Sequence, residues 1–277
     1  MSFKRILLPV NDQDDISLVA ELAFALADAH KAEVQGIFPQ DADRGNYWID
    51  NFGLNENEIE DAERIKKVKG AEAARRAKKK FSGYARKHKN INTSLIATFG
   101  DIGISLLDYA FCSDVIVLGN TTHKGSSYWR TLADDLLVQS TRPVIVSPSR
   151  PVSKEIGDRV VIAWKRGPEA ARAVAAAMPL IENAKQVQIA SVGESEDWQA
   201  VDTLKEYISL HAKNVETVVL PTKGENPGSV LVNKTAEQPG SILVMGAFSH
   251  ARWRERTFGG VTEYILRNTD VPVLMMH

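Results

Sequence analysis

The residues best suited to chemistry lie near the end of the chain, where glycines bracket a polar loop. Gly246 follows the apolar run 242–245, and Gly259 and Gly260 precede a helical pattern over 261–267. Backbone N–H groups at a helix start point outward and favour negative charge, so a strand, a glycine-bounded loop and a helix N-terminus together hold phosphate. Glycines also let the backbone come close to the anion. The stretch therefore predicts a phosphate-binding loop.

A weaker copy of this pattern lies in the first half of the chain. Residues 115–123 repeat the apolar run, the glycine and the final histidine of residues 243–250. Further matching segments are 5–11 with 159–165 and 142–146 with 271–275. The chain therefore contains an internal duplication, and a fold has to be inferred for each half. We expect two domains, 1–149 and 150–277, joined near the Pro/Ser stretch 148–151.

Composition narrows the class of protein. The formal net charge of -1 gives no overall attraction to nucleic acid or to a membrane surface. No apolar run approaches the ~20 residues of a membrane span, and the apolar run near the start is too short for a signal peptide. We expect a cytoplasmic protein without nucleic-acid or membrane partners. The one cysteine, Cys112, excludes an intramolecular disulfide and any multi-cysteine metal site, and its apolar helical surroundings predict a buried, inert thiol.

Short apolar runs alternate with helical patterns throughout both halves. The expected strands are 6–10, 34–38, 93–99, 115–118 and 144–147, then 160–164, 187–192, 215–220, 242–245 and 272–276. Continuous apolar strands that alternate with helices predict a parallel sheet covered on both faces. Such sheets bind ligands at the carboxyl ends of the strands, beside the point where the strand order reverses. The turns after strands one and four of each half are thus the predicted binding positions.

The halves differ in the segment between their second and third strands. In the first half, residues 40–68 add an acidic segment that carries Tyr47, Trp48, Phe52 and Leu54. We predict that this insert forms a partly helical flap over the first cleft or covers a neighbouring subunit. A strong helical pattern follows over 59–88, with expected interruptions at Gly70 and Gly83. Its many Lys and Arg residues could contact nucleic acid, but the interleaved alanines and Glu72 favour a solvated helix face.

Each half resembles a universal stress protein domain, and the chain looks like a tandem member of that family. The resemblance rests on residues 6–11, on Gly119 and Gly246 after the fourth strands, and on the closing Pro-Val segments at Pro143 and Pro272. It implies two Rossmann-like domains of the adenine nucleotide alpha hydrolase-like type. Each would hold a five-stranded parallel sheet of order 3-2-1-4-5, and the two would form an internal pseudo-dimer. The two closing strands would then pair within one chain, which leaves a monomer or a homodimer of such chains.

The nucleotide-binding branch of the family carries G-x2-G-x9-G-[S/T] after strand four, and the second half keeps part of it. Gly246 and Gly259 are in register, Ser249 replaces the second glycine, and Gly260 replaces the hydroxyl residue. The resemblance implies an adenine nucleotide such as ATP, with Mg²⁺ only as its companion. The implied binding residues are Ala163, Trp164, Lys165, Val192, Met245, Gly246, Ser249, His250, Gly259, Gly260, Val261 and Thr262.

The first half departs further from the motif. Gly119 is followed by Thr122, and Arg130 and Thr131 stand where the Gly-[S/T] pair belongs. The family's acidic residue after strand one is Asn11 in the first half and Lys165 in the second. His123 and His250 occupy equivalent loop positions, either as ligand contacts or as shared structural residues. Arg252, Arg254 and Arg256 with Trp253 could clamp an anion, or simply be solvated.

No signature of a nucleophile with its base accompanies these residues, so we expect neither catalytic residues nor an enzyme. The resemblance favours a binding and regulatory protein of the stress response, with adenine nucleotide in the second half. Two alternatives remain open: a weak nucleotide hydrolase, and a carrier of a non-nucleotide small molecule in the cleft of the enlarged first half.

Overall fold

The computed structural model describes residues 2–12, 15–41, 56–100, 102–119, 127–153, 155–193, 198–248 and 260–277. The elements of the first half alternate along the chain, as the sequence predicted. In chain order they are β1 (Arg5–Pro9), α1 (Ser17–His30), β2 (Glu33–Asp41), α3 (Glu56–Ala85), β3 (Thr93–Gly100), α4 (Ile102–Phe111), β4 (Val115–Leu118), α5 (Ser127–Gln139) and β5 (Val144–Val146).

The second half repeats the series with shorter helices. Its elements are β6 (Arg159–Ala163), α6 (Pro168–Ala176), α7 (Met178–Ile181), β7 (Gln186–Val192), α8 (Trp198–Ser209), β8 (Val215–Leu220), α9 (Pro227–Ala236), β9 (Ser241–Gly246), α11 (Gly260–Asn268) and β10 (Val273–Met276). Helices α6 and α7 are divided at Ala177, two residues before Pro179, whose missing N–H interrupts the helical ladder.

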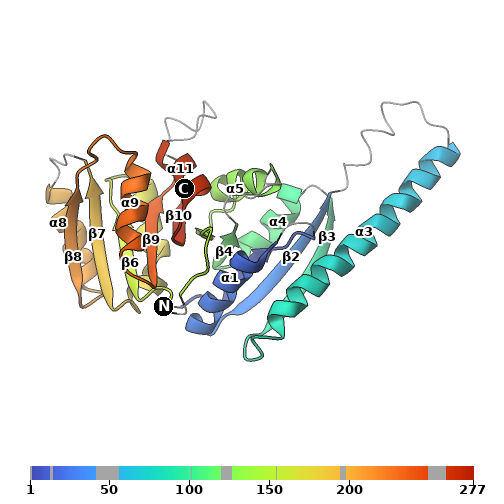
Figure 1. The fold of residues 1–277 in the computed structure, drawn as a ribbon, viewed down its shortest axis with the longest axis horizontal. Coiled ribbons are helices and arrows are strands. Elements are labelled where there is room, and N and C mark those ends of the chain that lie inside the picture. Colours follow the sequence, from blue (N-terminus) through green and yellow to red (C-terminus); the bar gives the residue numbers. More distant parts are fainter. Residues whose placement is uncertain are drawn as a thin grey trace.

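All ten strands belong to one sheet, in the order β3-β2-β1-β4-β5-β10-β9-β6-β7-β8 (Figure 1). Each half supplies five neighbouring strands in the order 3-2-1-4-5, which confirms the strand order that the resemblance implied. Parallel crossovers are right-handed, so the helices between strands one to three cover one face of each half and the remaining helices cover the other. Within the described residues, no helix is long and apolar enough to cross a membrane.

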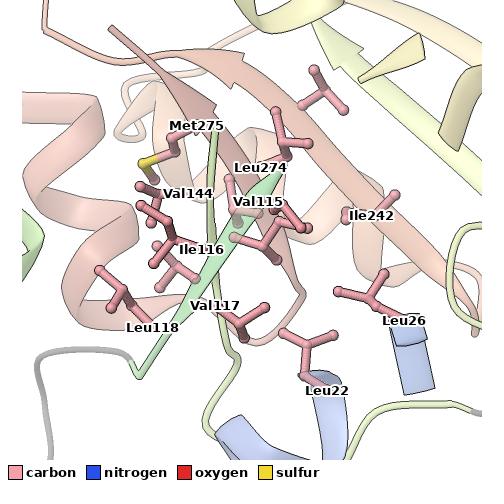
Figure 2. Packing of buried hydrophobic residues seen from close by; sticks show 14 of the residues in the cluster. Leu22, Leu26, Val115, Ile116, Val117, Leu118, Val144, Ile242, Leu274 and Met275 are labelled. Atoms are coloured by element: carbon pink, nitrogen blue, oxygen red, sulfur yellow. The ribbon is translucent and has the colours of Figure 1, made fainter. Parts of the chain in front are cut away.

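The two halves meet at an antiparallel seam between β5 and β10. Val273 lies opposite Val146, Leu274 opposite Ile145 and Met275 opposite Val144, and all six residues are fully buried. Figure 2 shows this seam inside a continuous cluster of aliphatic side chains that also includes β4 and α1. The predicted pairing of the two closing strands within one chain is therefore confirmed, and it covers edges that would otherwise expose apolar backbone.

Helix α3 is continuous, so the predicted interruptions at Gly70 and Gly83 are wrong. A glycine inside a helix costs only about 1 kcal/mol, which a long helix tolerates. At Gly70 an added Cβ would lie 2.8 Å from the Gln40 side-chain oxygen, so a small residue lets α3 approach the end of β2. The N-terminal part of α3 projects beyond the strands (Figure 1). Most of the predicted flap, residues 42–55, lies outside the described part of the chain.

The prediction for Cys112 is also wrong, because its side chain is exposed. Helix α4 ends at Phe111, and the residues that face the sheet are Leu106 and Ala110, four apart and fully buried. Cys112 follows the last helical residue and lies in the turn that leads to β4. The apolar pattern of the helix therefore does not extend to the thiol.

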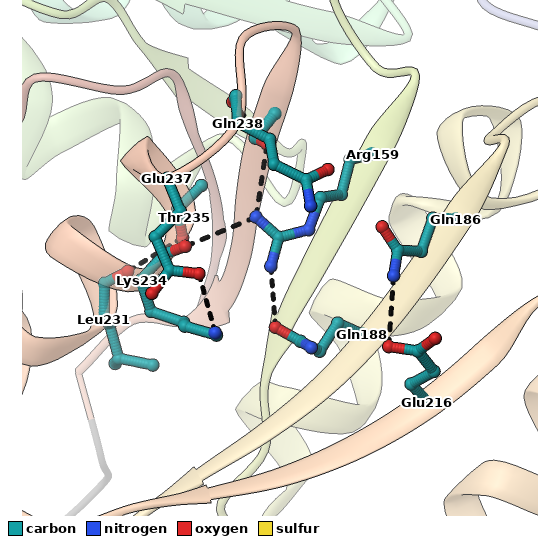
Figure 3. A network of polar contacts seen from close by, with 10 residues as sticks. Arg159, Gln186, Gln188, Glu216, Leu231, Lys234, Thr235, Glu237 and Gln238 are labelled. Carbon is teal, nitrogen blue, oxygen red and sulfur yellow. Dashed lines mark hydrogen bonds and ion pairs between the residues drawn. The ribbon is translucent and has the colours of Figure 1, made fainter.

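A buried arginine lies at the amino-terminal end of β6, in the second half (Figure 3). Arg159 is 3% exposed, and its guanidinium donates to Oε1 of Gln188 (2.7 Å) and to the carbonyl of Lys234 (3.3 Å). Burial lowers the pKa of Arg159 from its ordinary value, and the carboxylates of Glu237 and Glu216 oppose that shift. Arg159 thus joins β6, β7 and the end of α9 through side-chain hydrogen bonds.

Candidate functional site

The residues predicted after strands one and four of the second half lie next to each other. Strands β6 and β9 are neighbours, and Ala163 lies opposite Met245 at their carboxyl ends. Strand β10 adjoins β9 on the other side, with Met276 opposite Gly246. The strand order reverses between β6 and β9, which is where open parallel sheets hold ligands. The structure therefore brings these predicted positions to one edge.

Gly246 is required by packing between a strand and a helix. A Cβ at this position would lie 2.6 Å from the backbone N of Ala170 and 2.7 Å from the carbonyl carbon of Glu169. Both are backbone atoms at the start of α6, so they cannot rotate away. The glycine lets the end of β9 pass directly beside the N-terminus of α6. This reason concerns the scaffold, whereas the sequence assigned Gly246 to the ligand.

Two helices begin side by side at this edge. Helix α11 starts at Gly260, where an added Cβ would meet, among the described residues, only the Asn226 amide nitrogen, at 4.0 Å. Asn226 caps α9, because its Oδ1 accepts a hydrogen bond from the Gly228 N–H at 2.8 Å. In the first turn of α11, Val261 is half-buried and Thr262 is 4% exposed. Among the described residues, nothing packs against Gly260 as closely as α6 packs against Gly246, and two positive helix ends converge beside Gly260.

The segment that leaves β9 is held in place by the residue after β10. The Ala247 N–H donates to the Met276 carbonyl at 2.8 Å, and Phe248 adopts a left-handed backbone with φ of 50°. Nδ1 of His277 lies 3.1 Å from the Ala247 carbonyl oxygen and 3.0 Å from that of Phe248. Both partners are acceptors, so Nδ1 must carry the hydrogen. His277 therefore fixes the direction in which the loop starts.

No sequence pattern assigned a role to His277. Strands four and five are adjacent in the order 3-2-1-4-5, so the residue after strand five must lie beside the loop after strand four. That neighbour relation was available from the predicted topology. Nε of Arg172 donates to the His277 carbonyl at 2.8 Å, and this bond ties α6 to the same corner.

The turn after β6 presents side chains in two directions. The Trp164 N–H continues the ladder by donating to the Ala190 carbonyl at 2.8 Å, and its half-buried ring lines a groove beside α6 and α8. Lys165 is exposed at the head of the turn, and Val192 is half-buried at the end of β7. Ser249, His250 and Gly259 lie outside the described residues, as do Arg252, Trp253, Arg254 and Arg256, and their placement stays a prediction.

The first half differs at the corresponding edge because α3 reaches it. Oδ2 of Asp12, just beyond β1, accepts hydrogen bonds from Nε (3.1 Å) and Nη2 (2.7 Å) of Arg76. The Asp12 side chain retains only 10% exposure. Thr122 and His123 lie outside the described residues, as do the side chains of Arg130 and Thr131. Across the described parts of the chain, no group of three or more His, Cys, Asp or Glu residues could hold a metal ion.

Comparison with known families agrees with this architecture. Residues 158–277 match the model of the universal stress protein family. The second half of the chain is a universal stress protein domain. The match contains β6 to β10, and thus the whole of the edge described above. The resemblance inferred from the sequence is confirmed for this half, and no curated protein matches the chain significantly.

Solved structures extend the likeness to the full chain. A universal stress protein from Archaeoglobus fulgidus superposes with a TM-score of 0.71 at 17% identity, covering 98% of this chain and 97% of that one. A functionally unknown protein from Pseudomonas aeruginosa PAO1 superposes with a TM-score of 0.53 at 11% identity, covering 99% and 92%. At these identities the likeness establishes the fold, including its two-part arrangement.

Proposed function

We propose that this protein is a ligand-binding regulatory protein of the stress response, and that its second half binds an adenine nucleotide. The observation that carries the proposal is the start of α11 at Gly260, beside the reversal of strand order in a universal stress protein domain, where Asn226 is the only described residue near an added Cβ. The free N–H groups of a helix start favour a phosphate group there. The family match supports a nucleotide as the molecule that carries this phosphate.

The predicted residues take different roles in this proposal: Ser249, His250 and Gly259 keep those that the sequence motif implies, whereas the ring of Trp164 lines a separate groove. The backbone of Gly260, Val261 and Thr262 binds phosphate, and Lys165 adds a positive charge from the turn after β6. Ala163 and Met245, adjacent at the strand ends, offer an apolar surface for the base, with Val192 at its border. Gly246 acts indirectly, because it permits the close packing of α6 that shapes this edge.

We assign no nucleotide to the first half. The ion pair between Arg76 and Asp12 draws α3 over the end of β1, where the ligand of a parallel sheet would contact the first turn. In the sequence, Arg130 also brings a side chain to a position that a glycine fills in the nucleotide-binding motif. Both features narrow the approach to this edge, so the two halves should not be equivalent.

Isothermal titration with ATP and Mg²⁺ tests the proposal. We expect one site in the parent protein, loss of binding in Gly259→Leu, and little change in Arg130→Ala. Gly260→Ala should weaken binding without lowering thermal stability, because no described residue lies closer than 4.0 Å to the added Cβ. Two equivalent sites, equal losses from Gly259→Leu and Arg130→Ala, or no heat of binding in the parent protein would each contradict the proposal.

A further inference from the structure

The second half contains a groove that the proposed nucleotide does not occupy. It lies between the outer sides of α6 and α8 and has a volume of about 560 Å³. Cavities of a few hundred to about 1,000 Å³ are typical of small-molecule sites. Its lining residues are Trp164, Arg166, Ala171, Val174, Gln199, Ala200, Thr203, Leu204 and Tyr207. The start of α6, which packs against Gly246, lies between the sheet edge and this groove.

The equivalent space in the first half is filled. There the long helix α3 contributes Phe81, whose ring centroid lies 6.2 Å from that of Phe24 on α1. His88, just after α3, stacks on the same ring at 4.8 Å, and the Tyr84 hydroxyl hydrogen-bonds to the side chain of Ser17 at the start of α1. Helix α8 has 12 residues where α3 has 30. The same topology therefore gives a packed interface in one half and an open groove in the other.

The lining of the groove suits a flat, mostly apolar molecule. Trp164 and Tyr207 supply aromatic rings, and aromatic rings pair with other rings in offset or edge-to-face geometry. Val174 and Leu204 supply aliphatic surface, and both are buried. Tyr207 keeps 45% of its surface exposed, which is a large fraction for an aromatic side chain. A ligand in the groove would cover this surface.

Polar groups of the lining favour an acceptor or an anion on that molecule. Among the described residues that line the groove, Arg166 is the charged one, and guanidinium groups bind carboxylates and sulfonates through charge-assisted hydrogen bonds. The Thr203 hydroxyl donates to the Gln199 carbonyl at 2.8 Å, so its one hydrogen is already used. The Gln199 side chain is exposed beside it and carries amide N–H donors for an acceptor on the ligand. We infer that the groove between α6 and α8 binds a small planar aromatic molecule that carries one anionic group.

Two fluorescent probes that share a ring system test this inference on the full chain. The anionic probe is 1-anilinonaphthalene-8-sulfonate, and the neutral probe is N-phenyl-1-naphthylamine. We expect both to bind at one site, the anionic probe more tightly, and Arg166→Gln to abolish that difference. Tyr207→Ala should weaken both probes by about two- to tenfold, as expected for the loss of one aromatic contact. Thr203→Phe, which fills the groove, should prevent binding.

The matched control is Leu210→Ala. Leu210 lies just beyond the end of α8 and is 81% exposed, but it does not line the groove, so this variant should bind both probes like the parent protein. Thermal melts of each variant establish that it is folded, and saturating ATP should leave the probe titration unchanged. The inference is overturned if ATP displaces the probes, if Leu210→Ala weakens binding as much as Tyr207→Ala, or if Tyr207→Ala and Thr203→Phe leave binding intact.

Discussion

Two glycines that look alike in the sequence should respond oppositely to the same substitution. In Gly246→Ala, the new Cβ would lie 2.6 Å from the Ala170 nitrogen, which is 0.8 Å inside the 3.4 Å limit of ordinary contact. The contacted atoms are backbone, so β9 or α6 must shift. Overpacking of this kind costs about 1–3 kcal/mol. For a chain of this size we expect the melting temperature to fall by roughly 2–4 °C for each kcal/mol.

Gly260→Ala is the matched control, because within the described part of the chain the only heavy atom near its Cβ would be the Asn226 amide nitrogen at 4.0 Å. Gly260 is the first residue of a helix, a conformation that alanine adopts freely. Replacement of glycine at a compatible site stabilises by about 0.4–1 kcal/mol, since the unfolded chain loses conformational freedom. We therefore expect an unchanged or slightly raised melting temperature, together with weaker ATP binding.

Differential scanning calorimetry of the parent protein and both variants, with and without ATP, measures the two effects separately. The apo scans test the packing argument, and the shift caused by ATP tests the ligand argument. A Gly246→Ala protein that melts at the parent temperature would show that the contact with α6 relaxes without cost. If Gly260→Ala were as destabilising as Gly246→Ala, the space around Gly260 would not be open.

Three other residues give predictions of their own. Burial, with a smaller effect from Lys4, lowers the pKa of His30, so the unfolded chain binds a proton that the folded chain does not. The free energy of unfolding should therefore keep its full value above about pH 6.5 and fall as the pH drops below it. His30→Gln should make the free energy of unfolding, measured by urea titration, less dependent on pH. Arg159→Ala should lower the free energy of unfolding by about 1–3 kcal/mol for each buried acceptor left unpaired, and Arg159→Lys by less, as denaturant titration would show. Cys112 should react with a thiol reagent in the native protein as fast as in the unfolded chain, whereas slow native labelling would contradict its exposure.

The sequence predicted the sheet well because its signals are local. Continuous apolar runs mark buried parallel strands, whereas the order of the strands came from the family resemblance. The seam followed from one further argument, namely that closing strands such as Val144–Val146 are too apolar to remain at an edge. What sequence patterns missed depends on contacts between distant segments. Gly246 was assigned to a ligand, and only the position of Ala170 reveals its packing role.

Helices α3 and α4 also have features that sequence patterns could not predict. Periodicity could not show that Gly70 sits against Gln40, because that contact joins an insert to a strand. It also could not show where the apolar face of α4 ends, and Cys112 was placed inside it when it lies one residue beyond. The contact of His277 is a different case. The predicted strand order was already enough to place His277 beside the loop after β9.

One insertion accounts for most of the difference between the halves. The longer α3 places Phe81, Tyr84 and the following His88 in the space that remains a groove beside α8. Through Arg76, the same helix reaches the end of β1, where the corresponding turn of the second half is exposed at Lys165. A duplicated domain that lengthens this helix in one copy keeps the shared seam intact, because the seam pairs β5 with β10 and does not involve α3. Both ligands proposed here therefore belong to the half in which this helix stayed short.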